Sequence, residues 1–228
     1  MPVDLYIPTV DNPVWANWCL KSIMNNTNAV HVNEVKLLAK SPQTWLEKQR
    51  QALEVCTTEL VMQVQDDCLI MPGNPNWIEE MARPFAVDPA IGVVACSVTA
   101  AGAPNQRVRT GHAPGFYYTT NFAPIIMLWK PAAWRDAIGD ETEDFMCDQT
   151  IPLNLLTKGW KIVMCTSVAH YHEGMQTNLR VWCDNDPEKI KAWQVTAAAR
   201  IKDEIPKRYP PLWCARLDAS EMIPMVMP

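Results

Sequence analysis

The chain contains 228 residues, enough for one domain with a long tail or for two small domains, which excludes a large multidomain assembly. Its 20 Lys and Arg residues against 25 Asp and Glu give a formal net charge of −5, which argues against strong non-specific binding to nucleic acid. Hydrophobic residues make up 48% and charged residues 20%, so a packed core is expected and disorder is not.

The eight cysteines are too widely spaced for a zinc ribbon, since the nearest pair is Cys56 and Cys68. The chain begins without a charged and then apolar leader, and no apolar run approaches the roughly 18 residues that a membrane span needs. We therefore expect a cytoplasmic protein with reduced thiols and no transmembrane segment.

Strands and helices alternate through the first hundred residues. Short apolar runs rich in β-formers predict strands, and apolar residues recurring every three or four positions predict helices. This alternation favours a parallel α/β sheet. The expected strands are residues 3–8, 34–39, 59–70 and 91–98, and the expected helices are residues 14–26, 45–55 and 77–85.

The second half of the chain is less regular. Residues 100–120 show no period and predict a mobile loop that could offer Phe116, Tyr117 and Tyr118 to a ligand. Asp186 followed by Pro187 predicts the start of a helix with a stripe of Ile190, Trp193, Ala197 and Ile201. We also expect a strand at 125–129, a helix at 152–158, a strand at 161–165, a loop holding His170 and His172, and a proline-rich tail along the surface.

Two adjacent acids, Asp66 and Asp67, follow the apolar residues of the third expected strand. Ligands of open α/β sheets bind at the carboxyl ends of the strands, and carboxylate oxygens are what a hard divalent cation needs there. An acidic pair is also common in a solvated turn, so these two residues alone do not decide between a metal site and a turn.

Residues 60–94 resemble the central segment of the family 2 glycosyltransferases, which have the GT-A fold. The shared features are a strand, DxD-type acids, a Pro-Gly turn, an amphipathic helix and an Asp-Pro pair before an apolar strand. Further segments resemble the family in the same order, and together they span roughly residues 3 to 174. These segments are residues 3–27, Gln49-Arg50-Gln51, 138–141, 148–163 and 167–174.

The resemblance implies a Rossmann-like, mostly parallel central sheet flanked by helices. It implies a catalytic domain at residues 1–180, with a nucleotide-sugar-binding half at 1–98 and an acceptor half at 99–180. We expect residues 181–228, a helix and a tail, to lie against the same domain. The implied activity is metal-dependent, inverting transfer of a sugar from a nucleoside diphosphate to an acceptor hydroxyl.

The resemblance also implies roles for individual residues. Asp67 and His172 would bind Mn²⁺ or Mg²⁺, with Asp66 helping to hold the metal or the donor ribose. Asp148 would be the catalytic base, because an acceptor hydroxyl is a poor nucleophile until its proton is removed. His170 is expected at the surface or at the edge of the core rather than on the metal. Asp148 could in addition cap the helix that follows it.

Donor binding is implied for residues that end the first expected strand. Pro8, Thr9 and Asp11 lie where the family holds the nucleotide base. Arg50, and with less support Lys40, could contact the donor phosphates.

The sequence departs from the family pattern at three places. Gln65 stands where the first acid of the metal motif is expected, and Cys147 stands in place of Glu before the base. Leu38-Ala39-Lys40-Ser41-Pro42 occupies the position of a Val-Asp-Asp-Gly-Ser segment. The donor nucleotide therefore stays open.

Two other functions stay open. A nucleotidyltransferase would also need acids and a cation, but residues 8–13 lack the Gly-rich, basic loop that such enzymes usually carry. The altered motifs also allow a non-catalytic module that binds a nucleotide-sugar or a glycan. The acceptor class is equally open, from a glycan, metabolite or protein to a modified DNA base.

Overall fold

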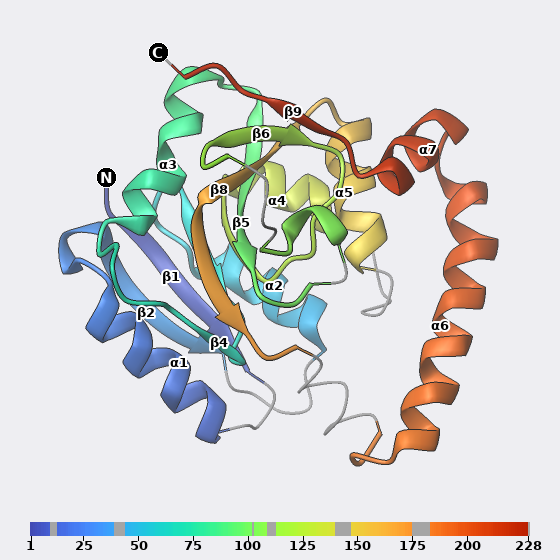
Figure 1. The fold of residues 1–228 in the computed structure, drawn as a ribbon, viewed down its shortest axis with the longest axis horizontal. Helices are drawn as coiled ribbons and strands as arrows, with labels where there is room; N and C mark the ends of the chain where they lie inside the picture. The colour runs from blue at the N-terminus through green and yellow to red at the C-terminus, as the bar shows by residue number, and fades with distance from the viewer. Residues whose placement is uncertain are drawn as a thin grey trace.

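The structure, a computed structural model, describes residues 1–9, 13–38, 44–101, 103–108, 113–139, 147–174 and 183–227. Within these ranges, nine strands form one sheet in the order β2-β1-β3-β7-β5-β8-β6-β9, with β4 paired to β8 (Figure 1). The strands are β1 (Val3–Pro8), β2 (Val32–Leu38), β3 (Val61–Val64), β4 (Cys68–Leu69), β5 (Ile91–Val98), β6 (Phe116–Thr119), β7 (Ile126–Trp129), β8 (Lys161–His172) and β9 (Met222–Pro224).

Most of the strands point the same way. β1 pairs in parallel with β2 and β3, and β5 pairs in parallel with β8. β7 lies between β3 and β5 and is antiparallel to both, which leaves β2, β1, β3, β5 and β8 in one direction. The expected α/β fold with a mostly parallel central sheet is therefore confirmed.

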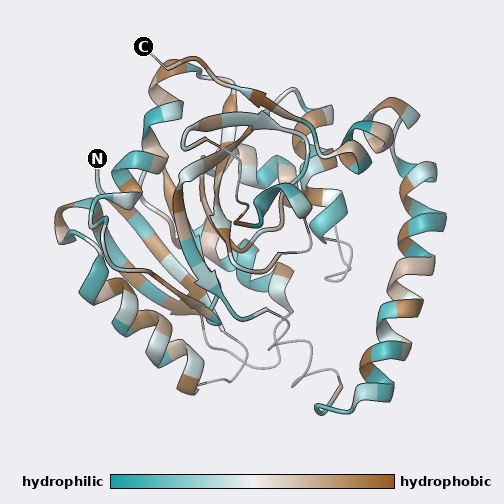
Figure 2. Cartoon of the chain, in the orientation of Figure 1, coloured by the Kyte–Doolittle hydropathy of each residue, from teal (hydrophilic) through white to brown (hydrophobic). Residues whose placement is uncertain are grey.

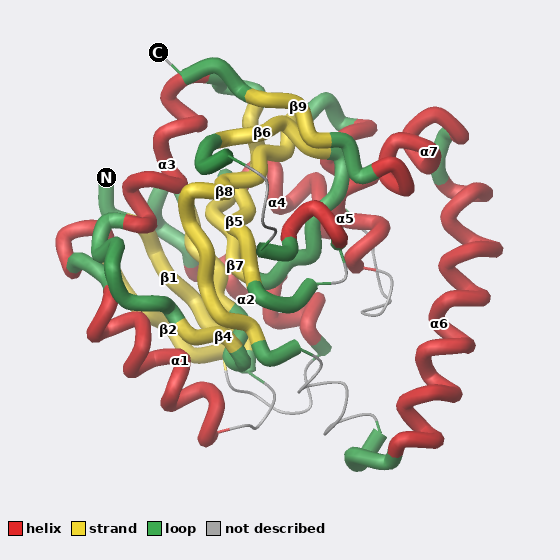
Figure 3. The backbone as a smooth tube through the Cα atoms, in the orientation of Figure 1, coloured by secondary structure: helices red, strands yellow, loops and turns green. Residues whose placement is uncertain are grey.

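Helices cover both faces of the sheet (Figure 3). One core cluster joins the sheet to α1 and α3, and a second joins it to α2, α4 and α5. Leu5 and Ile7 belong to the first cluster and Tyr6 to the second, as the two-residue period of a strand requires. The helices are α1 (Pro13–Asn26), α2 (Trp45–Val55), α3 (Trp77–Val87), α4 (Pro131–Ile138), α5 (Cys147–Thr157), α6 (Pro187–Arg208) and α7 (Pro211–Ala219), with 3-10 turns at Ala29–His31 and Pro104–Gln106.

Capping explains where two helices begin. The Thr44 side chain accepts a hydrogen bond from the Glu47 backbone, and the Glu47 carboxylate accepts one from the Thr44 backbone, which fixes the start of α2. Asp186 caps α6 ahead of Pro187, as expected. In the predicted stripe of α6, Ala197 is buried and the other three residues are half-buried. Figure 2 shows the mixed polar and apolar character of this helix.

The expected single strand at 59–70 is wrong. The backbone breaks into β3 and β4 because Gln65 opens a turn, in which the Cys68 N–H donates to the Gln65 carbonyl at 3.1 Å. The loop expected for His170 and His172 is also wrong, since β8 continues to His172. The register of its pairing with β5 shifts between Cys96 and Ser97, and the pairing then continues from Ser97 to Ala169 and from Val98 to His170. The strand therefore continues past an irregularity that interrupts the apolar sequence pattern.

Two further elements were missed. Phe116, Tyr117 and Tyr118 belong to β6 rather than to a loop over a ligand, and Gly102 and residues 109–112 of that loop lie outside the described residues. The tail folds into α7 and β9, and β9 pairs with β6. Both short strands depend on partners far away in the chain, which local patterns do not report. The expected helix at 152–158 begins earlier, at Cys147.

The structure bears on two smaller expectations. All eight cysteines fall within the described segments, where six are buried, two are half-buried and none is joined in a disulfide. No helix in the described ranges combines the length and hydrophobicity needed to cross a membrane.

Candidate functional site

The turn between β3 and β4 holds the two adjacent acids at the carboxyl end of β3. The Gln65 N–H donates to the Ile125 carbonyl at 3.0 Å, and the Gln65 side-chain amide donates to the Pro124 carbonyl at 3.0 Å. These bonds fix the start of the turn, and Asp66 and Asp67 that follow are each only 3% exposed. The acids therefore lie within the protein rather than on a solvated turn.

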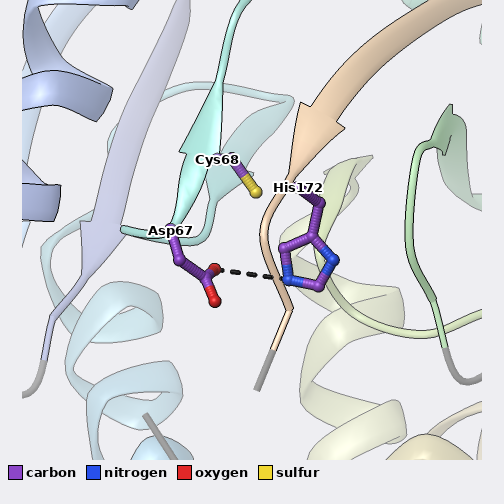
Figure 4. Close-up of side chains that lie close together, drawn as sticks. All are labelled: Asp67, Cys68 and His172. Atoms are coloured by element: carbon purple, nitrogen blue, oxygen red, sulfur yellow. Dashed lines mark ion pairs between the residues drawn. The ribbon is translucent and has the colours of Figure 1, made fainter. Parts of the chain in front are cut away.

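His172, the last residue of β8, faces this turn. Its Nε2 atom lies 3.3 Å from Oδ1 of Asp67, as Figure 4 shows. The Glu173 N–H donates to the Asp67 carbonyl at 3.1 Å, so the backbone also joins the end of β8 to the turn. Thr99 holds the strand from the other side, because its hydroxyl accepts from the His172 N–H at 2.9 Å.

The other nitrogen of the His172 ring contacts the backbone carbonyl of Ala100. A carbonyl oxygen can only accept, so Nδ1 carries the hydrogen and the neutral ring has its lone pair on Nε2, the atom that faces Asp67. Such a carbonyl contact fixes the tautomer of many metal-binding histidines. Burial lowers the pKa of His172, but the contact with Asp67, the Ala100 carbonyl and the charge of Asp148 together outweigh burial and raise the pKa.

The donor set fits a cation. Asp67 Oδ1 and His172 Nε2 are buried, and neither makes an aligned hydrogen bond within the described residues, despite their 3.3 Å contact. Asp67, Cys68 and His172 each offer one ligand atom, and these three atoms lie within 4.8 Å of one another. Buried lone pairs without a donor are rare in proteins, and a metal ion between these two atoms would satisfy both.

Asp148 lies in the first turn of α5, after the buried Cys147. Its side chain stays open to solvent, yet desolvation by the surrounding protein raises the pKa of its carboxyl to about 6, while His172 acts to lower it. The charges of Asp148 and His172 thus interact, and His172 in turn contacts Asp67. The structure thus places Asp67 and His172 in contact, and Asp148 on α5 is near enough to His172 for their charges to interact.

The predicted donor residues are only partly described. Pro8 and Thr9 are buried at the carboxyl end of β1, and the Thr9 N–H donates to the Leu38 carbonyl at 3.2 Å. Arg50 lies half-buried on α2. Asp11 and Lys40 lie outside the described residues.

Lys48, two residues before Arg50 on α2, is a buried residue that no sequence pattern had singled out. It is only 1% exposed, and its ammonium group donates to the Thr9 carbonyl. The available signal was its position among the inward-facing residues Leu46, Gln49 and Ala52 of a correctly predicted helix.

His170 is buried in the core, deeper than the surface or core-edge position that was expected, and it is not part of the metal-ligand cluster. Its Nδ1 atom accepts from the Met71 N–H at 3.2 Å, and its ring packs edge-on against Trp77 with centroids 4.8 Å apart. Burial lowers its pKa to about 4, so the ring is neutral. His170 is therefore separate from the cluster around His172.

Comparison with solved structures identifies the fold. The chain is similar to a mannosyltransferase from Pyrobaculum calidifontis in complex with GDP-Man and Mn²⁺ (13% identity, TM-score 0.56, 79% of this chain and 59% of that one). It is also similar to residues 1–349 of TarS from S. aureus, with 14% identity, a TM-score of 0.55, and coverage of 80% of this chain and 63% of that one. A third similar structure is GalNAc-T7 with UDP, GalNAc and Mn²⁺, with 9% identity, a TM-score of 0.56, and coverage of 75% of this chain and 44% of that one. The fold is that of the GT-A glycosyltransferases.

The likeness concerns the fold alone. The chain spans about 44 to 63% of the length of these three proteins. No family model matches the sequence, and no curated protein sequence matches it.

Proposed function

We propose that the chain is a metal-dependent, inverting glycosyltransferase similar to family 2, which moves a sugar from a nucleoside-diphosphate donor to an acceptor hydroxyl. The observation that carries the proposal is the contact of Asp67, at the carboxyl end of β3, with His172, at the carboxyl end of β8, in a GT-A-type sheet. The charge of Asp148 on α5 interacts with that of His172. Ligands of open α/β sheets bind at this edge.

Asp67 and His172 would hold a divalent cation, since both present buried lone pairs toward one another. When bound, such a cation stabilises the negative charge of the departing nucleoside diphosphate. Asp66, on the same turn, would help to hold the metal or the donor ribose. The complexes of two fold neighbours with Mn²⁺ support a divalent ion such as Mn²⁺ or Mg²⁺.

Asp148 would act as the base. Its carboxyl is accessible to an acceptor, and a pKa near 6 leaves it ionised at neutral pH but basic enough to take a proton. The acceptor hydroxyl would transfer its proton to Asp148 while its oxygen attacks the anomeric carbon from the side opposite the leaving diphosphate. That geometry inverts the configuration of the sugar.

The remaining predicted residues are proposed to bind the donor. Pro8, Thr9 and Asp11 would meet the base, and Arg50 would meet the phosphates. Residues 1–98 would then form the donor half of a domain at 1–180, residues 99–180 the acceptor half, and residues 181–228 a C-terminal part on the same domain. The contacts of α7 with α5 and of β9 with β6 support this last point.

The test is a panel of nucleotide-sugars incubated with Mn²⁺ and the intact chain. We expect slow donor hydrolysis that stops in Asp67→Ala protein. Asp218→Ala is the matched control, because Asp218 is an exposed acid on α7. Nucleotide-sugar binding without turnover, even with broad acceptor mixtures, would contradict catalysis and favour a binding module. Release of pyrophosphate from a nucleoside triphosphate and a sugar phosphate would favour a nucleotidyltransferase.

A further inference from the structure

We propose that Cys68 is a third ligand of the Asp67–His172 site and makes it selective for a thiophilic cation, of which Zn²⁺ is the physiological example. The inference rests on the proposed function, because it concerns the same site, and it changes the ion that this site binds best.

The strand register brings the sulfur to the site. Cys68 pairs directly with His172 across the antiparallel β4–β8 ladder, and residues paired in this way project from the same face. Asp67 precedes Cys68 in the turn, so the three side chains meet where β4 begins and β8 ends. Figure 4 shows the thiol and the carboxylate on the same side of the imidazole ring.

The spacing is compatible with tetrahedral coordination. Two oxygen or nitrogen ligands at about 2.0–2.1 Å from a tetrahedral Zn²⁺ are about 3.3 Å apart. Asp67 Oδ1 and His172 Nε2 are 3.3 Å apart, and the sulfur completes a set whose atoms all lie within 4.8 Å. Three protein ligands leave a fourth position for an oxygen of the substrate, as in many catalytic zinc sites.

The ligand types favour zinc over the harder ions. Mg²⁺ and Mn²⁺ prefer carboxylate, carbonyl and water oxygens, whereas thiolate and imidazole ligands suit Zn²⁺. Gln65 replaces a possible second carboxylate, and its side-chain amide donates to the Pro124 carbonyl. The cluster of Asp67, Cys68 and His172 thus offers one oxygen, one sulfur and one nitrogen. On binding, the thiol would release its proton to solvent and the sulfur would donate a lone pair to the ion.

The simpler role for Cys68 is that of a small core residue, because it is fully buried beside apolar side chains. Cobalt substitution separates the two roles. Co²⁺ added to the intact, metal-free chain should give a thiolate-to-cobalt charge-transfer band in the near ultraviolet. Cys68→Ser should abolish the band and weaken Zn²⁺ binding by about 100-fold or more, with a much smaller effect on Mn²⁺.

Cys96→Ser is the matched control, because Cys96 is an equally buried thiol on β5 outside the cluster. It should keep both the band and the zinc affinity. A band that survives in Cys68→Ser, or that never forms in the unaltered chain, would overturn the proposal.

Zinc X-ray absorption of the unaltered chain gives a second test that needs no variant. One sulfur at about 2.3 Å is expected. A first shell made only of oxygen and nitrogen would overturn the role of Cys68 even if the variants fail to fold. Neither measurement uses a donor, so the two proposals can fail separately. Manganese-dependent sugar transfer without a sulfur ligand would leave the proposed function standing, whereas a sulfur ligand without transfer of any sugar would leave only the metal site.

Discussion

The buried ammonium group of Lys48 donates a hydrogen bond to the carbonyl oxygen of Thr9 and so ties helix α2 to the carboxyl end of β1. This end of β1 is where the donor nucleotide is proposed to bind. The contact therefore links the packing of a helix to the shape of the proposed donor site.

Replacing this lysine should harm both stability and donor binding. Lys48→Met removes the ammonium group and leaves the buried Thr9 carbonyl without its hydrogen bond from Lys48. This loss should lower the free energy of unfolding by about 1–3 kcal/mol. Urea denaturation measures that loss, and nucleotide titration measures the weaker binding. Lys36→Met is the control, because Lys36 donates to the Val55 carbonyl at 2.8 Å near the surface. An equal loss of stability in both variants would contradict the importance of burial.

Asp148 should determine the pH dependence of the reaction. Because the pKa of its carboxyl is raised to about 6, the rate should rise as the pH passes through about 6 and Asp148 loses its proton. Asp148→Asn should lower kcat about 10²–10⁴-fold at neutral pH and abolish that rise. Initial rates with a working donor between pH 5 and 8 provide the measurement.

The same pKa predicts the sign of a stability effect. The folded protein holds the proton of Asp148 more tightly than the unfolded chain, so this group destabilises the fold progressively from about pH 4 to about pH 6 and remains unfavourable above. Asp148→Asn should therefore leave Tm at pH 7 unchanged or higher. A clear fall in Tm would show a structural role, and the loss of activity could not then be assigned to the base.

Restoring an acid at Gln65 should not restore a family-like site. Gln65→Asp removes the amide that donates to the Pro124 carbonyl and shortens the side chain. We expect a loss of about 0.5–1.5 kcal/mol of stability, since the Pro124 carbonyl then keeps only the hydrogen bond from the Gln63 side-chain amide. We expect no gain in Mn²⁺ affinity. Isothermal titration with Mn²⁺ checks this result. Tighter Mn²⁺ binding would mean that the new carboxylate reaches the ion and that the turn adapts.

Gly92 tests how closely α4 approaches the sheet. A Cβ atom at this position would lie 2.6 Å from Cβ of Ala133 and 3.3 Å from the Trp160 side chain. Gly92→Ala should therefore destabilise the fold by about 1–3 kcal/mol through overpacking. Gly115→Ala is the control, because its nearest neighbour would be an ordinary 3.9 Å away. Thermal unfolding of the two variants should separate them.

Local patterns predicted the elements that are stabilised locally or buried on both faces. The helix at Trp45–Val55 and the strand at Ile91–Val98 match the predicted bounds, because the first has an apolar face and the second is apolar throughout. The strands β6 and β9 were missed because the segments with which they pair are distant in the chain. The end of β8 was missed for the same reason, although it carries His172.

In the candidate site too, some residues could be found from sequence motifs and others only from the folded chain. Motif order named Asp67, Asp148 and His172. The structure places Asp67 against His172, and the charge of Asp148 interacts with that of His172, while their chemical roles stay predictions. Lys48 and Cys68 had no motif to reveal them. Their positions follow from a helix face and from the pairing of β4 with β8, which only the folded chain establishes.

The pairing of β9 with β6 has a consequence for solubility. Met222 and Ile223 lie against Thr119 and Tyr118, and Pro224 lies opposite Tyr117. A chain that lost β9 would leave the backbone amides and carbonyls on that side of β6 open, and an open strand edge is a template for pairing with other molecules. The C-terminal segment thus shields this margin of the sheet from self-association, and the absence of an N–H group in its proline makes that margin a poorer template.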